Sequence, residues 1–267
     1  MLDTAGLTFT YGRETPVFED FSWSIGKGES WAVIGASGCG KTTLLYLMAG
    51  LLHPSGGAIR IAGEPVVRPR PRTGLILQDH GLLPWATVRE NAALGLKIRA
   101  LYGPDGRHAP ADEAIDREEA RRRVDHWLWR LGIDRLADRY PGQLSGGQRQ
   151  RTAIARTLAL VPDLLLMDEP FSSLDAPTRE DLQSLTVQLR REAGAGGKLT
   201  TVIVTHTIEE AVFLGEKVLV LGHPPNSDPR IIENPSAGEE SYRQSPSYLE
   251  KVEEVRSAIG ERHENPV

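Results

Sequence analysis

Alternating apolar and polar residues dominate the first part of the chain. They alternate over residues 7–12, 17–30 and 56–66, and this spacing is typical of strands that bury one face. A continuous apolar run begins at residue 30, as in a strand that is buried on both faces. Residues 73–79 form another compact apolar run between turn residues, and we expect a central strand there. The N-terminal part of the chain is therefore predicted to be rich in β-structure.

The apolar residues change to helical spacing at Thr87. Thr87 followed by Glu90 is a capping-box pattern, which marks the N-terminus of a helix. Three helices are expected in this region, over residues 87–101, 118–132 and 145–161, with a polar loop at 102–117. The third helix stops before Pro162, because proline cannot continue a helix.

Beyond Pro162, short apolar strands alternate with helical segments. Strands are expected at residues 163–169, 199–206 and 216–222, and helices at residues 178–194, where glycine ends the helix, and 207–215. Strands that alternate with helices indicate an α/β fold with a mostly parallel sheet and helical crossovers. The helical stretch at about 87–160 is then an insertion into that fold.

The last 45 residues differ in composition from the rest. We predict one main domain over residues 1–222 and a short tail over residues 223–267, which is rich in Pro, Asn, Ser and Glu. One amphipathic helix is expected near the end of this tail. Its apolar side is predicted to carry Leu249, Val252, Val255 and Ile259.

Composition narrows the class of protein. The chain has 267 residues, of which 40% are hydrophobic, so it can bury a sizeable core. Its net charge of -5 argues against a general nucleic-acid binder, which carries a basic face. We see no run of the roughly 20 apolar residues that a membrane span needs and no secretory signal. We therefore expect a cytosolic protein whose membrane association depends on a partner.

The single cysteine, Cys39, excludes an internal disulfide and a multi-cysteine metal site. It lies in a glycine-rich stretch, "GASGCGKTT", where Gly35, Gly40, Lys41 and Thr42 match the pattern G-x-x-x-x-G-K-[ST]. Cys39 is interpreted as a small residue in a tight loop, with a reactive thiol as the alternative.

The glycine-rich stretch predicts a phosphate-binding loop. Glycines allow backbone N–H groups to converge on phosphate oxygens, and a helix that starts near Lys41 adds its positive dipole end. Lys41 is expected to reach the terminal phosphates and Thr42 to hold Mg²⁺. The alternative is a tight strand-to-helix turn that ends in lysine by chance.

Two further stretches carry candidate chemistry. Asp168 ends a buried strand, where a carboxylate can hold Mg²⁺, and Glu169 is the candidate general base for an attacking water. Ser145, Gly146 and Gly147 precede a long helix and form a second anion site. Adjacent acids after a strand can instead cap a helix, and a Ser-Gly-Gly sequence by itself is usually a flexible cap.

Taken together, these motifs resemble those of ABC-type ATPases over roughly Leu7 to Gly222. "GASGCGKTT" is similar to the Walker A loop, "LSGGQ" to the ABC signature, "LLLMDEP" to Walker B and "SSLD" to the D-loop, in the order of that family. The resemblance implies a P-loop NTPase core with an N-terminal antiparallel β subdomain and an inserted α-helical subdomain. It also implies an ABC ATPase domain over residues 1–222.

The resemblance assigns residues to ATP. The ATP-binding residues that it implies are Tyr11, Gly35, Ser37, Gly38, Cys39, Gly40, Lys41, Thr42 and Thr43. The signature residues, which bind the ATP of a partner subunit, are Leu144, Ser145, Gly146, Gly147 and Gln148. The metal ligands that it implies are Thr42, Gln78 and Asp168.

Single residues also receive roles from the resemblance. Gln78 matches the glutamine that contacts Mg²⁺ and the attacking water, and His206 matches the switch histidine that contacts the γ-phosphate. Tyr11 matches the aromatic that stacks on adenine, and Asp175 matches the D-loop aspartate that couples two sites across a dimer. The alternatives are a surface glutamine, a structural histidine and a core tyrosine. Adenine over guanine rests on the resemblance alone, because stacking tolerates any base.

In this family two ATPase subunits pack head to tail, and each ATP lies between the Walker A loop of one and the signature of the other. We therefore expect a homodimer on ATP binding, membrane permease subunits as partners, an indirect link to a solute-binding protein, and no nucleic acid. The expected location is the cytoplasmic face of the cell membrane.

Within the family, "LLPW" after Gln78 resembles the ATPases of nitrate, sulfonate and taurine importers. Trp85 and Leu83 either help to form a groove for the permease or pack within the helical insertion. The loop at 102–117 is longer than expected, Ala36 replaces a frequent proline and Thr207 a frequent aspartate. None of these departures changes a catalytic group, but they leave the solute open.

We weigh two alternatives to an importer subunit. One is a soluble ABC protein outside transport, but such proteins usually carry two fused cassettes, a long coiled coil or a basic partner surface, which this chain lacks. The other is an ATP-binding module that does not hydrolyse ATP, against which Lys41, Asp168, Glu169 and His206 argue.

Overall fold

The computed structural model describes residues 1–12, 15–192 and 199–264. The chain divides into two compact units. Unit 1 comprises Met1–Pro69, Leu166–Glu169 and Thr200–Val267, and unit 2 comprises Arg70–Leu165 and Pro170–Leu199. Each unit therefore contains segments that are far apart in the sequence.

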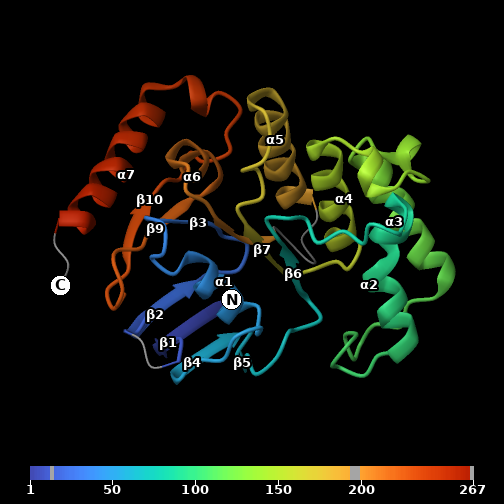
Figure 1. Ribbon diagram of the computed structural model, residues 1–267, viewed down its shortest axis with the longest axis horizontal. Helices are drawn as coiled ribbons and strands as arrows, with labels where there is room; N and C mark the ends of the chain where they lie inside the picture. Colours follow the sequence, from blue (N-terminus) through green and yellow to red (C-terminus); the bar gives the residue numbers. More distant parts are fainter. Residues whose placement is uncertain (13–14, 193–198, 265–267) are drawn as a thin grey trace. The chain divides into compact units, whose positions relative to one another are not determined.

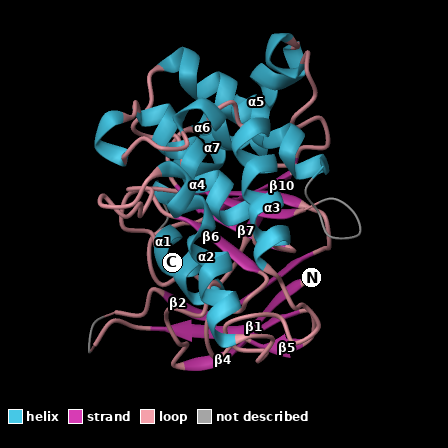
Figure 2. Ribbon diagram, turned by 90° about the vertical axis from the view of Figure 1, so that its right-hand side faces the viewer, coloured by secondary structure: helices cyan, strands magenta, loops and turns pink. Residues whose placement is uncertain are grey.

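The first segment of unit 1 forms a four-stranded antiparallel sheet (Figure 2). Its strands are β2 (Phe18–Ile25), β1 (Leu2–Phe9), β4 (Gly56–Ile61) and β5 (Glu64–Pro65), in that order across the sheet. Buried and exposed residues alternate along β2 and along the first half of β1, so one face of the sheet is covered. This confirms the predicted N-terminal antiparallel β subdomain.

The second sheet of unit 1 contains the buried apolar runs. It holds β10 (Arg230–Glu233), β9 (Lys217–Val220), β3 (Ser30–Ile34), β8 (Thr200–Val204) and β7 (Leu164–Asp168), in that order. β3 pairs in parallel with both β8 and β9, and all residues of β3, β7 and β8 are buried. Continuous apolar strands fit a parallel sheet that is covered on both faces. The α/β fold class is therefore confirmed.

The tail adds a strand that the sequence pattern did not predict. β10 pairs antiparallel with β9, and Ile232 faces the interior with 4% of its surface exposed. The strand has only four residues and one buried side chain, which is too little for a periodicity signal.

The strand at residues 73–79 is shorter than predicted, and its predicted central position is wrong. β6 (Thr73–Ile76) lies at the end of the six-stranded order, next to β7, whose first two residues belong to unit 2. This edge strand is apolar because helix α4 (Gly146–Leu158) covers it: a Cβ atom on Gly74 would lie 2.4 Å from the Cγ2 atom of Thr157 in that helix. An edge strand whose face is covered by a helix therefore shows the same apolar pattern as a central strand.

Unit 2 carries four of the predicted helices. They are α2 (Val88–Tyr102), α3 (Arg117–Arg130), α4 (Gly146–Leu158) and α5 (Ala176–Glu192), with short 3₁₀ turns at Asp134–Leu136 and Pro141–Gln143. The capping box of Thr87 and Glu90 is present at the start of α2, as predicted. The predicted end of the α5 helix at Gly194 lies outside the described residues.

Helices α1 (Lys41–Met48), α6 (Ile208–Leu214) and α7 (Pro246–Glu264) belong to unit 1 (Figure 1). α7 packs on α6, and the hydroxyl of Tyr248 donates to the carbonyl of Glu209 at 3.0 Å. The buried side of α7 carries Tyr248, Val252, Val255 and Ala258. Leu249 was predicted on this side, but it is 67% exposed, because Tyr248 takes the position one turn before Val252.

Candidate nucleotide-binding and catalytic site

The glycine-rich loop connects the end of β3 at Ile34 to the start of α1 at Lys41. Gly40 is the N-cap residue of α1 and has a left-handed φ of 102°. A Cβ atom at Gly40 would lie 2.5 Å from Cγ1 of Val17, so only glycine fits here. No side chain caps α1, and its first N–H groups therefore remain available for an anion.

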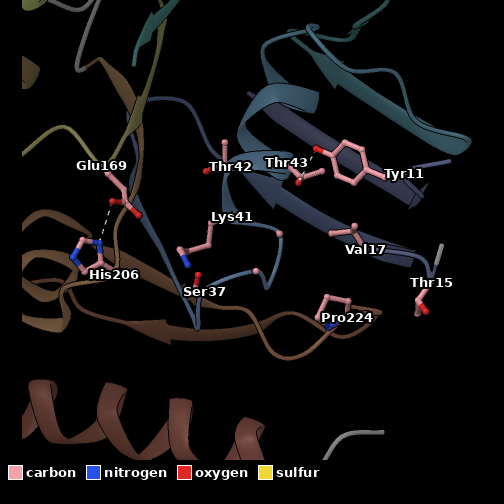
Figure 3. Close-up of a pocket in the computed structure, with 12 residues that line it drawn as sticks. Tyr11, Thr15, Val17, Ser37, Lys41, Thr42, Thr43, Glu169, His206 and Pro224 are labelled. Carbon is pink, nitrogen blue, oxygen red and sulfur yellow. Dashed lines mark hydrogen bonds and ion pairs between the residues drawn. The ribbon is translucent and has the colours of Figure 1, made fainter. Parts of the chain in front are cut away.

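The lysine of this loop points into a pocket (Figure 3). Lys41 is 7% exposed, and its Nζ donates to the carbonyl oxygens of Gly35 at 2.9 Å and of Ala36 at 2.8 Å. The ammonium group is thereby held inside the curve of the loop, next to the N-terminus of α1. Two positive features converge at one point, which suits a phosphate group.

The hydroxyl of Thr42 and the carboxylate of Asp168 meet beside this loop. Thr42 Oγ1 donates to Asp168 Oδ1 at 3.1 Å. Burial raises the pKa of Asp168, and the hydrogen bond from Thr42 opposes this effect. A hydroxyl and a carboxylate are oxygen ligands that suit Mg²⁺, which commonly takes one or two protein ligands with substrate phosphates. Among the described residues no cluster of three or more acidic, His or Cys side chains offers a complete metal cage.

Glu169 and His206 lie next to each other on one side of the pocket (Figure 3). His206 Nδ1 lies 3.1 Å from Glu169 Oε2. The main-chain N–H of Glu169 still bonds to Val204 O at 2.9 Å, while its φ of 44° is left-handed. Glu169 holds this unfavourable backbone conformation directly after β7, and its side chain lines the pocket. With a phosphate bound in the pocket, a water molecule between the phosphate and these two side chains could give a proton to the carboxylate.

Tyr11 is not a core residue. It is 46% exposed, its hydroxyl lies 3.1 Å from Thr43 Oγ1, and its ring packs edge-on against Phe9 at 4.8 Å. The ring is therefore accessible at the pocket, and an accessible aromatic ring can stack on a base.

The pocket has a volume of about 1030 Å³. Its walls combine the predicted loop residues with residues from other segments of unit 1. They are Tyr11, Thr15, Val17, Ser37, Gly38, Gly40, Lys41, Thr42, Thr43, Glu169, His206 and Pro224. Thr15, Val17 and Pro224 were not predicted, and they carry no motif that could have revealed them.

The side chain of Cys39, a residue of this loop, is buried and does not line the pocket. It is 1% exposed, and burial raises the pKa of its thiol. Both features oppose the alternative of a reactive thiol. Gly35 is also packed inward, since a Cβ atom there would lie 2.7 Å from Cys39 Sγ.

The signature residues lie in unit 2, at the start of α4. Ser145 and Gln148 form a reciprocal capping box: Ser145 Oγ accepts from Gln148 N at 3.3 Å, and Gln148 Oε1 accepts from Ser145 N at 3.0 Å. Leu144 is buried beside them. Gly146 is the first residue of the helix, and a Cβ atom on Gly147 would lie 2.5 Å from the Cγ2 atom of Thr178 in α5. The predicted capping alternative is thus a real feature of this segment.

Gln78 and Asp175 also belong to unit 2. Gln78 is exposed and follows β6. Asp175 is exposed, and its Oδ2 accepts from Thr178 N at 3.3 Å in the first turn of α5. Hydrogen bonds from Thr178 lower the pKa of Asp175. Asp175 therefore stays charged and caps α5.

A glycine-rich loop with an inward lysine, joined to an acidic strand end and a histidine, defines a P-loop nucleotide-binding protein. The ABC transporter family matches residues 18–172 of the chain. The chain belongs to this family. It is an ABC transporter ATPase, in which ATP hydrolysis is coupled to transport.

Curated relatives match nearly the whole chain. A protein of Shigella boydii serotype 4 described as "Taurine import ATP-binding protein TauB" is 38% identical over 99% of this chain and 99% of its own length. A Pseudomonas aeruginosa protein of the same description is 39% identical over 80% of this chain and 74% of its own length.

Solved structures share the fold. The dimeric, post-hydrolysis structure of the ATP-binding cassette MJ0796 bound to ADP and Pi has a TM-score of 0.71 and 30% identity, and it covers 87% of this chain and 98% of that one. The cbiO1 structure from Clostridium perfringens, part of the ABC transporter complex cbiONQ, has a TM-score of 0.73 and 27% identity, with 96% and 98% covered. Among the residues that the structure describes, no helix combines the length and apolar character of a membrane span.

Proposed function

We propose that this chain is the ATPase subunit of an importer for a small sulfonate such as taurine. The observation that carries this proposal is the 38% identity to a taurine import ATP-binding protein over 99% of both chains. Nitrate and other small anions are the remaining candidates for the solute. The "LLPW" stretch before α2 agrees with this branch of the family.

The chemistry that we propose is hydrolysis of the terminal phosphate of ATP. Lys41 and the N-terminus of α1 bind the phosphates, and Tyr11 stacks on the adenine. Glu169 Oε2 accepts a proton from the attacking water, and His206, whose Nδ1 lies 3.1 Å from this carboxylate oxygen, contacts the γ-phosphate. Thr42, Asp168 and Gln78 are the proposed ligands of Mg²⁺, which supplies positive charge to the phosphates.

We propose that the signature residues act in a homodimer. The N-terminus of α4 provides a second anion site, formed by Leu144, Ser145, Gly146, Gly147 and Gln148, for the ATP of the partner subunit. The capping box holds the Ser145 hydroxyl at this end of the helix. Asp175, fixed at the start of α5, couples the two sites.

The proposed membrane partner is a pair of permease subunits, with a solute-binding protein delivering the solute. Trp85 is 73% exposed, so ordinary packing within the helical insertion does not explain this side chain. Leu83 is half-buried, and its N–H donates to Asn91 Oδ1 at 2.8 Å. We infer that Trp85 contacts the permease at the cytoplasmic face of the membrane.

The proposed domain organisation is an ABC ATPase domain over residues 1–222 and a tail over residues 223–267. The helical subdomain at about 87–160 is inserted into the first. Segment Arg70–Leu165 of unit 2 includes this insertion, which agrees with the proposal.

Replacing Glu169 with Gln tests the proposed base. The amide keeps the size of the side chain but accepts a proton far less readily, so turnover should fall by about 10²–10⁴-fold with ATP affinity retained. Phosphate release and ATP binding are measured on the same preparation. Unchanged turnover would show that another group activates the water.

Purification from native membranes tests the proposed transport role. Tagged Glu169→Gln protein should bring down a multi-span permease, and adding Trp85→Ala should reduce its recovery. Trp129→Ala is the matched control, since Trp129 is also in unit 2 and is 68% exposed. The reconstituted complex carrying wild-type Glu169 should then hydrolyse ATP faster with the binding protein and taurine than with nitrate. Recovery of cytosolic partners alone would instead support a non-transport ABC ATPase.

A further inference from the structure

A buried asparagine of the C-terminal tail is bonded to the phosphate loop. Asn226 is 2% exposed, and its Nδ2 donates to Cys39 O at 2.9 Å and to Val17 O at 3.2 Å. Its Oδ1 accepts from the N–H of Gly222 at 2.9 Å. This set of two carbonyls and one N–H matches the two donors and the acceptor of an asparagine amide. All four residues belong to unit 1.

The main chain of Asn226 reinforces the same contacts. Its N–H donates to Val17 O at 3.0 Å, and its carbonyl accepts from Glu19 N at 3.0 Å. Val17 therefore receives two hydrogen bonds from one tail residue. Since Val17 Cγ1 lies against Gly40, the tail also holds the wall on which the phosphate loop rests.

The bond to Cys39 determines the orientation of one peptide group in the loop. The carbonyl of Cys39 and the N–H of Gly40 belong to the same planar trans peptide, so they point in opposite directions. With the carbonyl bound to Asn226 beneath the loop, the N–H of Gly40 turns toward the pocket, which Gly40 lines.

The loop itself cannot hold this orientation firmly. Gly38 and Gly40 flank the cysteine, and both have a positive φ, of 79° and 102°. Glycine reaches many backbone conformations at little cost, so the Cys39–Gly40 peptide can rotate unless an outside group holds it. Asn226 is such a group, and it is 187 positions away in the sequence.

We propose that Asn226 is a positioning residue of the nucleotide site, which holds the Gly40 N–H in the orientation that binds a phosphate. The proposal rests on nucleotide binding at this pocket, as proposed above. Asn226 does not touch the nucleotide; it acts through Cys39. The tail is accordingly part of the nucleotide-binding machinery, to which Pro224 contributes a wall of the pocket (Figure 3).

The chain offers a matched control for this proposal. Asn234 is also a buried tail asparagine of unit 1, at 1% exposed, and its Nδ2 donates to Val212 O at 2.6 Å and to Gly215 O at 2.8 Å. Its Oδ1 accepts from the hydroxyl of Tyr242. Both asparagines thus make two donated bonds and one accepted bond, but only Asn226 binds the phosphate loop.

The test compares Asn226→Ala with Asn234→Ala for ADP affinity by calorimetry and for amide hydrogen exchange in the loop. We expect both variants to lose thermal stability. Only Asn226→Ala should weaken ADP binding, by about tenfold, and speed exchange at residues 38–42, because a charge-assisted hydrogen bond contributes that order of affinity. Wild-type ADP affinity in Asn226→Ala would overturn the proposal. An equal loss of ADP affinity in both variants would also overturn it, since that result indicates a general loss of stability.

Two further variants keep the outcome interpretable. If Asn226→Ala does not fold, Asn226→Ser, which keeps one hydrogen-bonding group, takes its place with the same expectation. Lys41→Ala tests the nucleotide site itself and should abolish ADP binding. If Lys41→Ala binds ADP normally, the nucleotide site is wrongly assigned; if only the asparagine comparison fails, the positioning role alone is refuted.

Discussion

Replacing Tyr242 with Phe tests how the tail is attached to helix α6. Tyr242 is 3% exposed, and its hydroxyl donates to Oδ1 of Asn234. Asn234 in turn holds the carbonyls of Val212 and Gly215 at the end of α6. Phenylalanine keeps the ring but leaves the buried amide oxygen of Asn234 without this donor. We expect unfolding to become easier by about 2 kcal/mol, within the range for an unsatisfied buried acceptor.

This loss corresponds to a lower melting temperature of roughly 4–8 °C for a chain of this size. The measurement is thermal and urea unfolding of both proteins, followed by tryptophan fluorescence. Tyr102→Phe is the control, because Tyr102 is 54% exposed and removing its hydroxyl leaves no buried group unpaired. A Tyr242→Phe protein as stable as the wild type at pH 8 would refute the reasoning.

The same substitution has a predicted pH dependence. Burial, followed by the nearby Tyr248, Glu239 and Glu254, raises the pKa of Tyr242 to about 12. An unfolded phenol ionises near pH 10, so between pH 10 and about 12 the unfolded chain loses this proton while the folded chain keeps it. The wild type therefore loses stability in this window, and the variant lacks that contribution. The difference in stability between them should narrow from pH 10 upward, and a constant difference would contradict the assignment.

Three further predictions concern the loop and unit 2. Gly40→Ala should weaken ADP binding at least tenfold in calorimetry, because its Cβ would lie 2.5 Å from Val17 Cγ1 at a left-handed φ. Cys39 should react slowly with iodoacetamide in the folded protein and rapidly in urea, since it is 1% exposed and burial raises its thiol pKa. Arg99→Ala should lower the free energy of unfolding of the protein by about 2–4 kcal/mol in urea titrations, because its guanidinium, 4% exposed, bonds two main-chain carbonyls and Glu113. Arg99→Lys should not restore this stability, since one ammonium group does not reproduce the guanidinium fork.

Helix starts were predictable because their signals are local. Thr87 and Glu90 stand three residues apart and form the capping box at α2, and Ser145 and Gln148 do the same at α4. Strand position was less predictable. β6 has the apolar run of a central strand yet lies at the edge, because an apolar run reports burial and not which element provides it.

The residues of the proposed nucleotide site were predictable to different degrees. Its loop residues are contiguous around Lys41, and Asp168 and Glu169 adjoin at one strand end, so a short pattern predicts them. Val17 and Pro224 line the pocket from segments without any motif.

The amino-acid sequence alone predicted the class of fold, the helix starts and a phosphate-binding loop, because each follows from local patterns of neighbouring residues. Only the tertiary structure decided that β6 lies at the edge of its sheet and that the tail contributes strand β10 and exposes Leu249. It also decided that Asn226 forms a hydrogen bond to the phosphate loop. Each of these features depends on contacts between segments that lie far apart in the chain. A hydrogen bond between Asn226 and Cys39 leaves no periodicity in the sequence, since only the folded chain brings the two together.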